Sequence, residues 1–186
     1  MDENEIELET VDSLGAGAVG DPGEREFFLQ ARTESAQLTV LVEKEQVALL
    51  ATEAVAFLDR IADQYPEDLI TLPNAVAELH EPTVPLFRAR MIGLGFDPER
   101  ELVLIELRER SDDDDDEDDD EHDEDDDEAS LPVEIEEGYV ARIYATRSQV
   151  RAMAAHGAGV VAEGRPLCEL CSQPLDPSGH RCPRWN

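Results

Sequence analysis

All three cysteines of the chain lie near its C-terminus, together with one of its four histidines. Cys168, Cys171, His180 and Cys182 follow the pattern Cys-x2-Cys-x8-His-x-Cys. A Cys-x2-Cys turn brings two thiolates to one cation, and a tetrahedral Zn²⁺ then needs two further ligands, for which His180 and Cys182 are the nearest candidates. Because four protein ligands leave no position for water, the pattern predicts a structural Cys3His zinc site.

Other interpretations of these cysteines remain open. A Cys-x2-Cys redox pair is typical of a strand-to-helix junction, whereas this one lies in a proline-rich segment. The cysteines could also be incidental in an unstructured tail, although their clustering argues against that. Iron is an alternative metal for the same ligands. We therefore expect a zinc-binding tail over residues 164–186, with Zn²⁺ as the cofactor.

The charge of the chain limits its partners. Acidic residues outnumber basic ones 46 to 15, and the formal net charge is −31. In the run 112–128 only His122 is uncharged at neutral pH. The carboxylates of such a run repel one another and the run buries no apolar surface, so we expect a disordered acidic loop over 111–130.

The negative net charge also argues against a nucleic-acid partner. The sequence shows no secretory signal and no membrane-spanning stretch, so we expect a cytoplasmic protein without a membrane partner.

Hydrophobic periodicity and turn residues predict the elements that must position these side chains. Strands are expected at 14–19, 26–32 and 38–43 before a helix at 44–64, then at 85–96, 101–110 and 138–145 before a helix at 146–163. Asp21-Pro22 and Asp97-Pro98 mark turns at corresponding places. The pattern predicts an α+β fold, in which two βββα repeats form one mainly antiparallel sheet of about six strands with the helices on one face. Chance recurrence of common turns is the alternative. Residues 1–12 are expected to be a disordered arm, and 13–163 the domain.

Several arginines could share the outer face of this sheet, since strand alternation places Arg88 and Arg90 opposite the apolar Phe87. The candidate anion-binding residues of this arginine face are Arg25, Arg32, Arg88, Arg90, Arg108 and Arg142. The favoured alternative is that the arginines pair with nearby acids of the strands, namely Glu26, Glu43, Glu101 and Glu106.

Three motifs together resemble a known family. They are residues 17–31, residues 43–47, and the tail pattern Cys-x2-Cys followed by Pro-Leu-Asp-Pro-x-Gly-His-x-Cys-Pro. The same motifs occur in this order in an actinobacterial family of unknown function, domain of unknown function 3090. The resemblance covers nearly the whole chain and implies the same domain layout, but no activity. Glu169 and Ser172 depart from it, because proline and glycine are usual there.

The sequence contains no recognisable catalytic or nucleotide-binding motif. Residues 15–20 match the letters of the dinucleotide-binding pattern, but a turn and a strand follow instead of a helix. We therefore predict a non-enzymatic interaction or regulatory module with an unidentified protein partner or anionic ligand, and no catalytic residue. The alternatives are nucleotide or nucleic-acid binding through the arginine face, and an enzyme acting on a phosphorylated small molecule.

Overall fold

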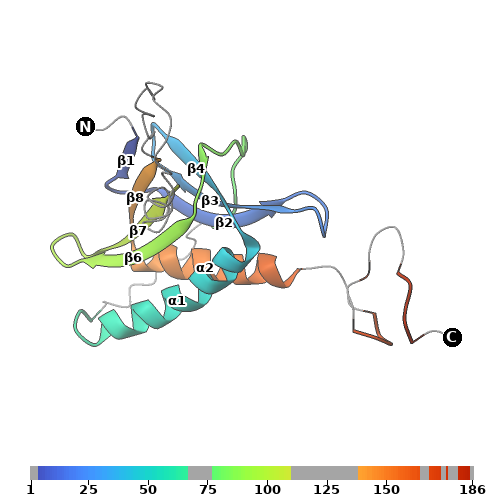
Figure 1. Ribbon diagram of the computed structural model, residues 1–186. Coiled ribbons are helices and arrows are strands. Elements are labelled where there is room, and N and C mark those ends of the chain that lie inside the picture. The colour runs from blue at the N-terminus through green and yellow to red at the C-terminus, as the bar shows by residue number, and fades with distance from the viewer. Residues whose placement is uncertain are drawn as a thin grey trace, which may run out of the picture.

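The computed structural model describes residues 4–66, 77–109, 138–163, 168–172, 175 and 180–184 (Figure 1). The first half contains β1 (Glu5–Leu8), β2 (Ser13–Val19), β3 (Glu26–Arg32), β4 (Gln37–Val42) and helix α1 (Lys44–Ala62). The second half contains β5 (Phe87–Arg88), β6 (Met91–Asp97), β7 (Leu102–Arg108), β8 (Val140–Ala145) and helix α2 (Arg147–Ala162). The predicted acidic loop 111–130 lies outside the described residues.

The fold is α+β, as predicted, but its strands form two mixed sheets of four strands each. The strand orders are β1-β8-β7-β6 and β2-β3-β4-β5. In each sheet three consecutive strands form an antiparallel meander, while the fourth strand comes from the other half of the chain and pairs in parallel. The predicted single, mainly antiparallel sheet of six strands is therefore wrong. A description as two βββα repeats does not match either, because it leaves out β1 and β5.

Strand β1 also corrects the predicted disordered arm. Its residues pair in parallel with β8, from Glu5 opposite Val140 to Leu8 opposite Ile143. Ile6 and Leu8 pack against the core, while Glu5 and Glu7, which alternate with them, are more exposed. The alternation of a half-buried edge strand was present in the sequence, but four residues with two acids gave too weak a signal.

The predicted strand 85–96 is divided between the two sheets. The backbone amide of Ala89 donates to the carbonyl oxygen of Leu41 in β4, at 2.9 Å. The next amide, of Arg90, donates to the carbonyl oxygen of Arg108 in β7, at 2.7 Å. The chain thus leaves one sheet and enters the other between two consecutive residues, and this exchange places β6 at an edge.

Both helices begin with the same arrangement. The amide of Glu43 donates to the side-chain oxygen of Gln46, and the amide of Thr146 donates to that of Gln149, at 2.7 and 2.8 Å. Each pair completes a capping box, which satisfies amides at a helix start. The Gln149 side chain also donates to the carbonyl oxygen of Val11, so it ties its helix to a distant segment.

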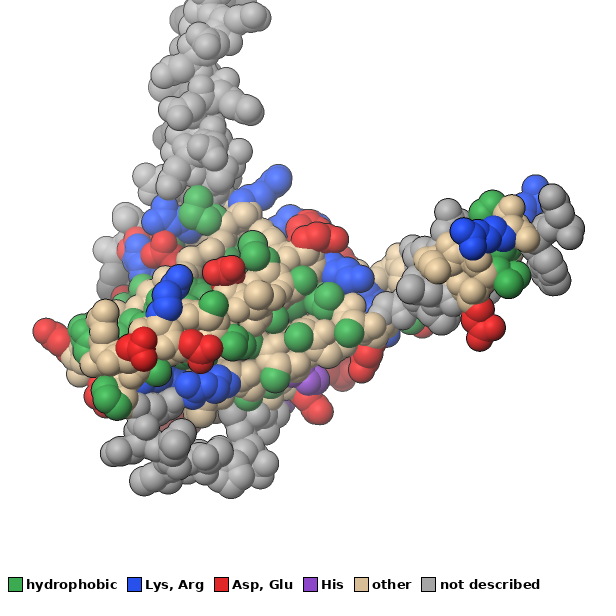
Figure 2. Space-filling view, turned by 90° about the horizontal axis from the view of Figure 1, so that it is seen from below, with side chains coloured by type: hydrophobic (Ala, Val, Ile, Leu, Met, Phe, Trp, Pro, Cys, Tyr) green, Lys and Arg blue, Asp and Glu red, His purple; other side chains and the backbone are tan. Residues whose placement is uncertain are grey.

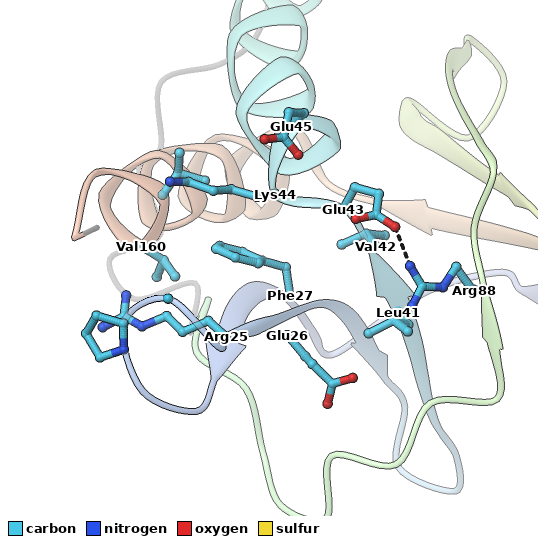
Figure 3. Close-up of a pocket in the computed structure, with 13 residues that line it drawn as sticks. Arg25, Glu26, Phe27, Leu41, Val42, Glu43, Lys44, Glu45, Arg88 and Val160 are labelled. Atoms are coloured by element: carbon cyan, nitrogen blue, oxygen red, sulfur yellow. Dashed lines mark hydrogen bonds and ion pairs between the residues drawn. The ribbon is translucent and has the colours of Figure 1, made fainter. Parts of the chain in front are cut away.

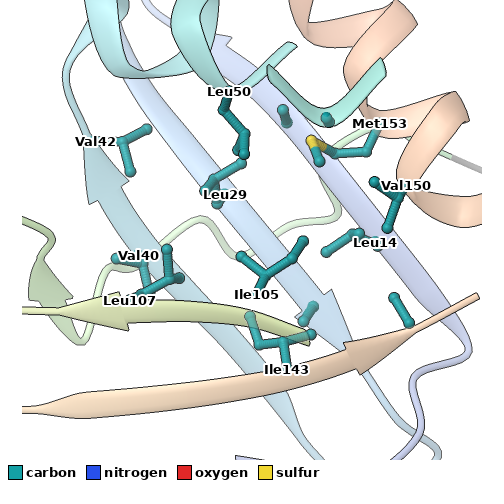
Figure 4. Packing of buried hydrophobic residues seen from close by; sticks show 14 of the residues in the cluster. Leu14, Leu29, Val40, Val42, Leu50, Ile105, Leu107, Ile143, Val150 and Met153 are labelled. Atoms are coloured by element: carbon teal, nitrogen blue, oxygen red, sulfur yellow. The ribbon is translucent and has the colours of Figure 1, made fainter. Parts of the chain in front are cut away.

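The core lies where both sheets meet the two helices (Figure 4). Ile105 of β7 lies toward Leu29 of β3, and Leu107 lies beside Val40 of β4, while Leu50 and Met153 extend from the helices into the same cluster. The two helices lie side by side on the same side of the sheets (Figure 1). Within the described part of the chain, neither helix has the length and apolarity to cross a bilayer.

Candidate metal centre

The structure brings the four predicted ligands together in the tail. One ligand atom from each of Cys168, Cys171, His180 and Cys182 lies within 4.8 Å of all the others. The cysteine thiols are only partly buried, as is the histidine. Residues 168–172 form a turn, closed by a 2.8 Å hydrogen bond from the amide of Ser172 to the carbonyl oxygen of Cys168. These four side chains are therefore close enough to bind one metal ion.

The distances within the cluster fit a small tetrahedral site. Two sulfurs bonded at about 2.3 Å to one tetrahedral ion would lie about 3.8 Å apart. The Sγ atoms of Cys168 and Cys182 are separated by 3.8 Å. The Sγ of Cys171 lies 3.1 Å from Nε2 of His180, so this pair would need to open by a few tenths of an ångström to hold an ion. Three sulfurs and an imidazole are donors that suit Zn²⁺ and iron and suit Mg²⁺ or Ca²⁺ poorly.

The turn itself prepares one thiol for metal binding. Hydrogen bonds from the backbone of Cys171 and then Leu170 lower the pKa of the Cys168 thiol to about 7. A thiol with this pKa is partly ionised at neutral pH, and the thiolate is the form that binds metal. Arg184 donates to the carbonyl oxygen of Leu170 at 3.2 Å, which connects the two ends of the tail.

The predicted arginine face is spread over separate places. Arg25 directly precedes β3 and Arg32 is its last residue, so seven steps of about 3.4 Å each, roughly 24 Å, separate them. Arg90 is exposed beside α1. Arg108 and Arg142 instead share one carboxylate, that of Glu106, because their Nε atoms both lie 2.9 Å from its oxygens.

This shared carboxylate was among the predicted acidic partners. Partial burial tends to raise the pKa of Glu106, but hydrogen bonds from Arg108 and Arg142 outweigh it, and the pKa is lowered. The hydrogen bonds that Arg142 donates to Glu106 and then to Glu5 raise the pKa of Arg142. The charges of Arg108 and Arg142 are therefore engaged in holding β1, β7 and β8 together.

Arg25 and Arg88 do line one cavity, of about 350 Å³, beside the start of α1 (Figure 3). Lys44 contributes a third positive charge, but three carboxylates line the same cavity, those of Glu26, Glu43 and Glu45. The Arg88 guanidinium forms an ion pair with Glu43, and the Arg25 guanidinium donates to the backbone carbonyl oxygen of Glu163. The formal charges of the lining cancel, and its arginines already have partners.

Sequence reasoning missed a second cavity, between α1 and β6. It encloses about 450 Å³ and has a mostly apolar lining. The α1 side chains Leu49 and Phe57 lie off the buried face of the helix, and this widened apolar surface was the one signal in the sequence. The sequence did not show that β6 lies beside this surface of α1, because the position of β6 depends on the passage of the chain from one sheet to the other.

Comparison with known proteins identifies the family but adds no activity. The family model described as "Protein of unknown function (DUF3090)" matches residues 6–182, which is nearly the whole chain and includes all four candidate ligands. No curated protein matches the chain, and no solved structure does. The chain therefore belongs to the DUF3090 family.

Proposed function

We propose that this chain is a non-enzymatic interaction or regulatory module whose tail is folded by a structural Zn²⁺. The observation that carries the proposal is the convergence of Cys168, Cys171, His180 and Cys182, whose ligand atoms all lie within 4.8 Å of one another. A short segment rich in proline and glycine has little core of its own, so metal-binding energy would supply the energy for folding it.

The ligand set favours a structural ion over a catalytic one. Catalytic zinc sites commonly keep three protein ligands and an open position for water or substrate, whereas structural sites are closed by four. With three thiolates and a neutral imidazole, the site has a formal charge of −1, which weakens the ion as a Lewis acid. The proposal also places the chain in the cytoplasm, where thiols stay reduced.

Zinc is proposed over iron because it has no redox chemistry and commonly occupies closed Cys3His sites. Iron with the same ligands is an outcome that the experiment below distinguishes. In either case Cys168, Cys171, His180 and Cys182 would hold the ion, and its role would be to fix the turn at 168–172 against the segment at 180–184.

Anion binding is the second candidate function. One observation favours it, namely that Arg25 and Arg88 line the same cavity as Lys44. Retention on a polynucleotide or phosphate column should decrease with salt if this function is real, because released counterions drive such binding. We expect no retention at about 0.15 M salt, since the cavity carries balanced charges and the chain is strongly acidic. A catalytic role on a phosphorylated substrate would require the same binding.

The metal is tested by elemental analysis of full-length protein purified without chelator. We expect about one equivalent of zinc per chain, and a metal–sulfur distance of about 2.3 Å by X-ray absorption. Cys171→Ser should lose the metal and expose residues 165–186 to proteolysis while the rest stays folded. Glu169→Gln, an exposed change between the two cysteines, is the matched control and should keep the metal. Less than half an equivalent of any transition metal, with three titratable thiols, would overturn the proposal.

A further inference from the structure

The cavity between α1 and β6 is a groove open to solvent. Its walls carry the apolar side chains of two elements, namely Leu49, Leu50 and Phe57 of α1 and Met91, Ile92 and Leu94 of β6. Leu50 is almost fully buried, but 63% of the surface of Leu49 is exposed at the rim. Hydrophobic side chains lie on the helical side of the molecule in Figure 2. An apolar groove with a half-exposed rim favours binding to another apolar surface.

The groove runs along a strand with one neighbour. In the part of the chain that the structure describes, β6 is the last strand of its sheet and pairs with β7 alone. The side chain of Gln46 donates to the carbonyl oxygens of Ala89 and Arg90, so α1 and β6 lie together at this end. An edge strand directs alternate amides and carbonyl groups away from its sheet, where an extended peptide can pair with them.

Two glycines of β6 are not required by the packing of the fold. Among the described residues, a Cβ added at Gly93 would meet only the Cβ of Glu106, at 3.9 Å, and one added at Gly95 would meet only Leu104, at 3.5 Å or more. Both are ordinary contact distances, and both glycines have ordinary backbone angles. Glycine inside a strand weakens it and often marks a place where another backbone approaches closely. Both glycines lie on the sheet face of Glu106 and Leu104, opposite to Ile92 and Leu94, and their lack of a side chain leaves room beside the backbone of β6.

The other edge that faces a helix is closed. Strand β2 also lies at the end of its sheet, but α2 packs directly on it. A Cβ added at Gly157 of α2 would lie only 3.3 Å from the Cβ of Ala16 in β2. Larger side chains, such as Phe57 and Leu94, separate α1 from β6 and leave the groove between them. Of these two edge strands, only β6 therefore has a groove between itself and the neighbouring helix in the described part of the chain.

Charge defines the ends of the groove. Arg90 lies beside Gln46 near the start of α1, and Arg60 lies in its last turn, about 20 Å away at 1.5 Å per residue. Arg90 has no ion pair among the described residues, and Arg60 lies over the Phe57 ring at 5.7 Å. Glu53 is the one acid in the lining. At physiological salt, interactions beyond about 8 Å are screened, so these arginines dominate locally in spite of the net charge.

We infer that the α1–β6 groove binds an extended segment of a partner protein that carries alternating aliphatic side chains and a carboxylate at each end. The segment adds to the edge of β6 as a fifth strand, places its aliphatic side chains against Leu49, Phe57 and Leu94, and pairs its carboxylates with Arg60 and Arg90. This inference rests on the proposed role as an interaction module and names its binding surface. A second copy of this chain is a poorer occupant, because two chains of formal charge −31 repel each other.

The test uses a labelled peptide, fluorescein-Asp-Val-Thr-Val-Thr-Val-Asp-amide, titrated with full-length, zinc-loaded protein at 0.15 M salt. Fluorescence anisotropy should show saturable binding that is roughly tenfold tighter than for the same peptide with lysine at both ends. Two further peptides carry N-methyl groups on alternate amides, one on each edge of the extended chain. Only one of the two should lose binding, because a strand pairs through one edge.

Protein variants assign the binding to the groove. Arg60→Glu with Arg90→Glu should reverse the preference between the two peptides. Lys44→Glu with Arg32→Glu makes the same change in net charge outside the groove and should leave both affinities within about twofold. Repeating the titration with Cys171→Ser separates the two proposals, since loss of the metal should not alter binding in the groove.

Three results would overturn the inference. One is absence of saturable binding by zinc-loaded protein, which would leave the metal proposal intact. Another is equal binding of both N-methylated peptides, which would exclude strand pairing. The third is dimerisation in sedimentation experiments that Leu49→Glu abolishes, because it would identify a second copy as the occupant.

Discussion

Gly157 of α2 lies directly against Ala16 of β2. A Cβ added at Gly157 would lie 3.3 Å from the Cβ of Ala16 and 3.1 Å from a methyl carbon of Val47 in α1. Gly159, two residues further along and on another face of the same helix, has no neighbour among the described residues within 4 Å of such a Cβ. The close approach of α2 to β2 and α1 therefore explains the first glycine and not the second.

These two glycines give opposite predictions for stability. Gly157→Val should lower the free energy of unfolding by about 1–3 kcal/mol, because two methyl groups must displace Val47 and Ala16. Gly159→Ala should raise it by roughly 0.5–1 kcal/mol, because alanine favours the helix and meets no neighbour. Urea unfolding at pH 7 and fixed zinc concentration measures both. Equal midpoints for the wild type and Gly157→Val would contradict the packing described above.

Local patterns predicted the elements and the turns between them. The sequence Lys44-Glu45-Gln46-Val47 begins a helix, and the Asp-Pro turns after β2 and within the β6–β7 hairpin were recognised from residues close together in the chain. The division into two sheets was not predictable in this way. It depends on the parallel pairing of β1 with β8, whose residues Glu5 and Val140 are 135 positions apart. The hydrophobic periodicity of a short segment carries no information about a contact between residues so far apart in the chain.

The candidate site divides in the same manner. The four metal ligands lie within fifteen residues, so the short chain between them keeps them close together. Their spacing in the sequence was therefore sufficient to predict that they form one cluster. The arginine face required knowledge of which strands are neighbours. Arg142 lies across from Glu106, and Arg108 lies two residues from Glu106 on the same strand, whereas Arg25 precedes β3 and Arg32 ends it.

The Glu106 carboxylate should give the protein part of its pH dependence. The pKa of Glu106 is lowered in the folded protein, so the stabilisation is fully present above the unfolded pKa of about 4.3. It is lost as the pH falls below that value and through the lower folded pKa. Glu106→Gln removes the charge that Arg108 and Arg142 share, and we expect it to cost about 0.5–1 kcal/mol at pH 7.

Urea unfolding at several pH values between 7 and 3 measures this effect. The difference in the free energy of unfolding between wild type and Glu106→Gln should shrink as the pH falls below about 4.3. Glu26→Gln is the matched control, because Glu26 is exposed in β3 and has no ion pair among the described residues. A difference that stays constant over the whole range would show that the ion pairs do not contribute.

Deletion of residues 112–128 should leave the melting temperature almost unchanged at moderate salt. The residues on either side of this segment are held together independently of it. The amide of Glu109 donates to the carbonyl oxygen of Tyr139, and the amide of Tyr139 donates to the Glu109 carboxylate, at 2.9 and 3.0 Å. Removal of sixteen acids also reduces self-repulsion. Calorimetry measures the shift, and a fall of about 5 °C or more would mean that the segment contributes roughly 1 kcal/mol of specific contacts.

Ser172 has backbone angles that favour glycine. Its φ is +57°, in the left-handed region, and its amide closes the turn that carries Cys168 and Cys171. A side chain in this region costs about 1–2 kcal/mol relative to glycine. The turn geometry therefore gives a physical reason to expect glycine at this position.

Ser172→Gly should therefore tighten metal binding by the tail. The variant removes the steric cost in the folded turn but adds backbone freedom to the unfolded tail, which offsets part of the gain. A net gain of about 0.5–1 kcal/mol corresponds to a two- to fivefold lower dissociation constant. Competition between the protein and a chromophoric zinc chelator at pH 7.5 measures this constant. Ser172→Ala is the control, because alanine keeps the Cβ and loses only the hydroxyl, so its affinity should stay at or below that of the wild type. Equal tightening by both substitutions would assign the effect to the lost hydroxyl and contradict the argument from backbone angles.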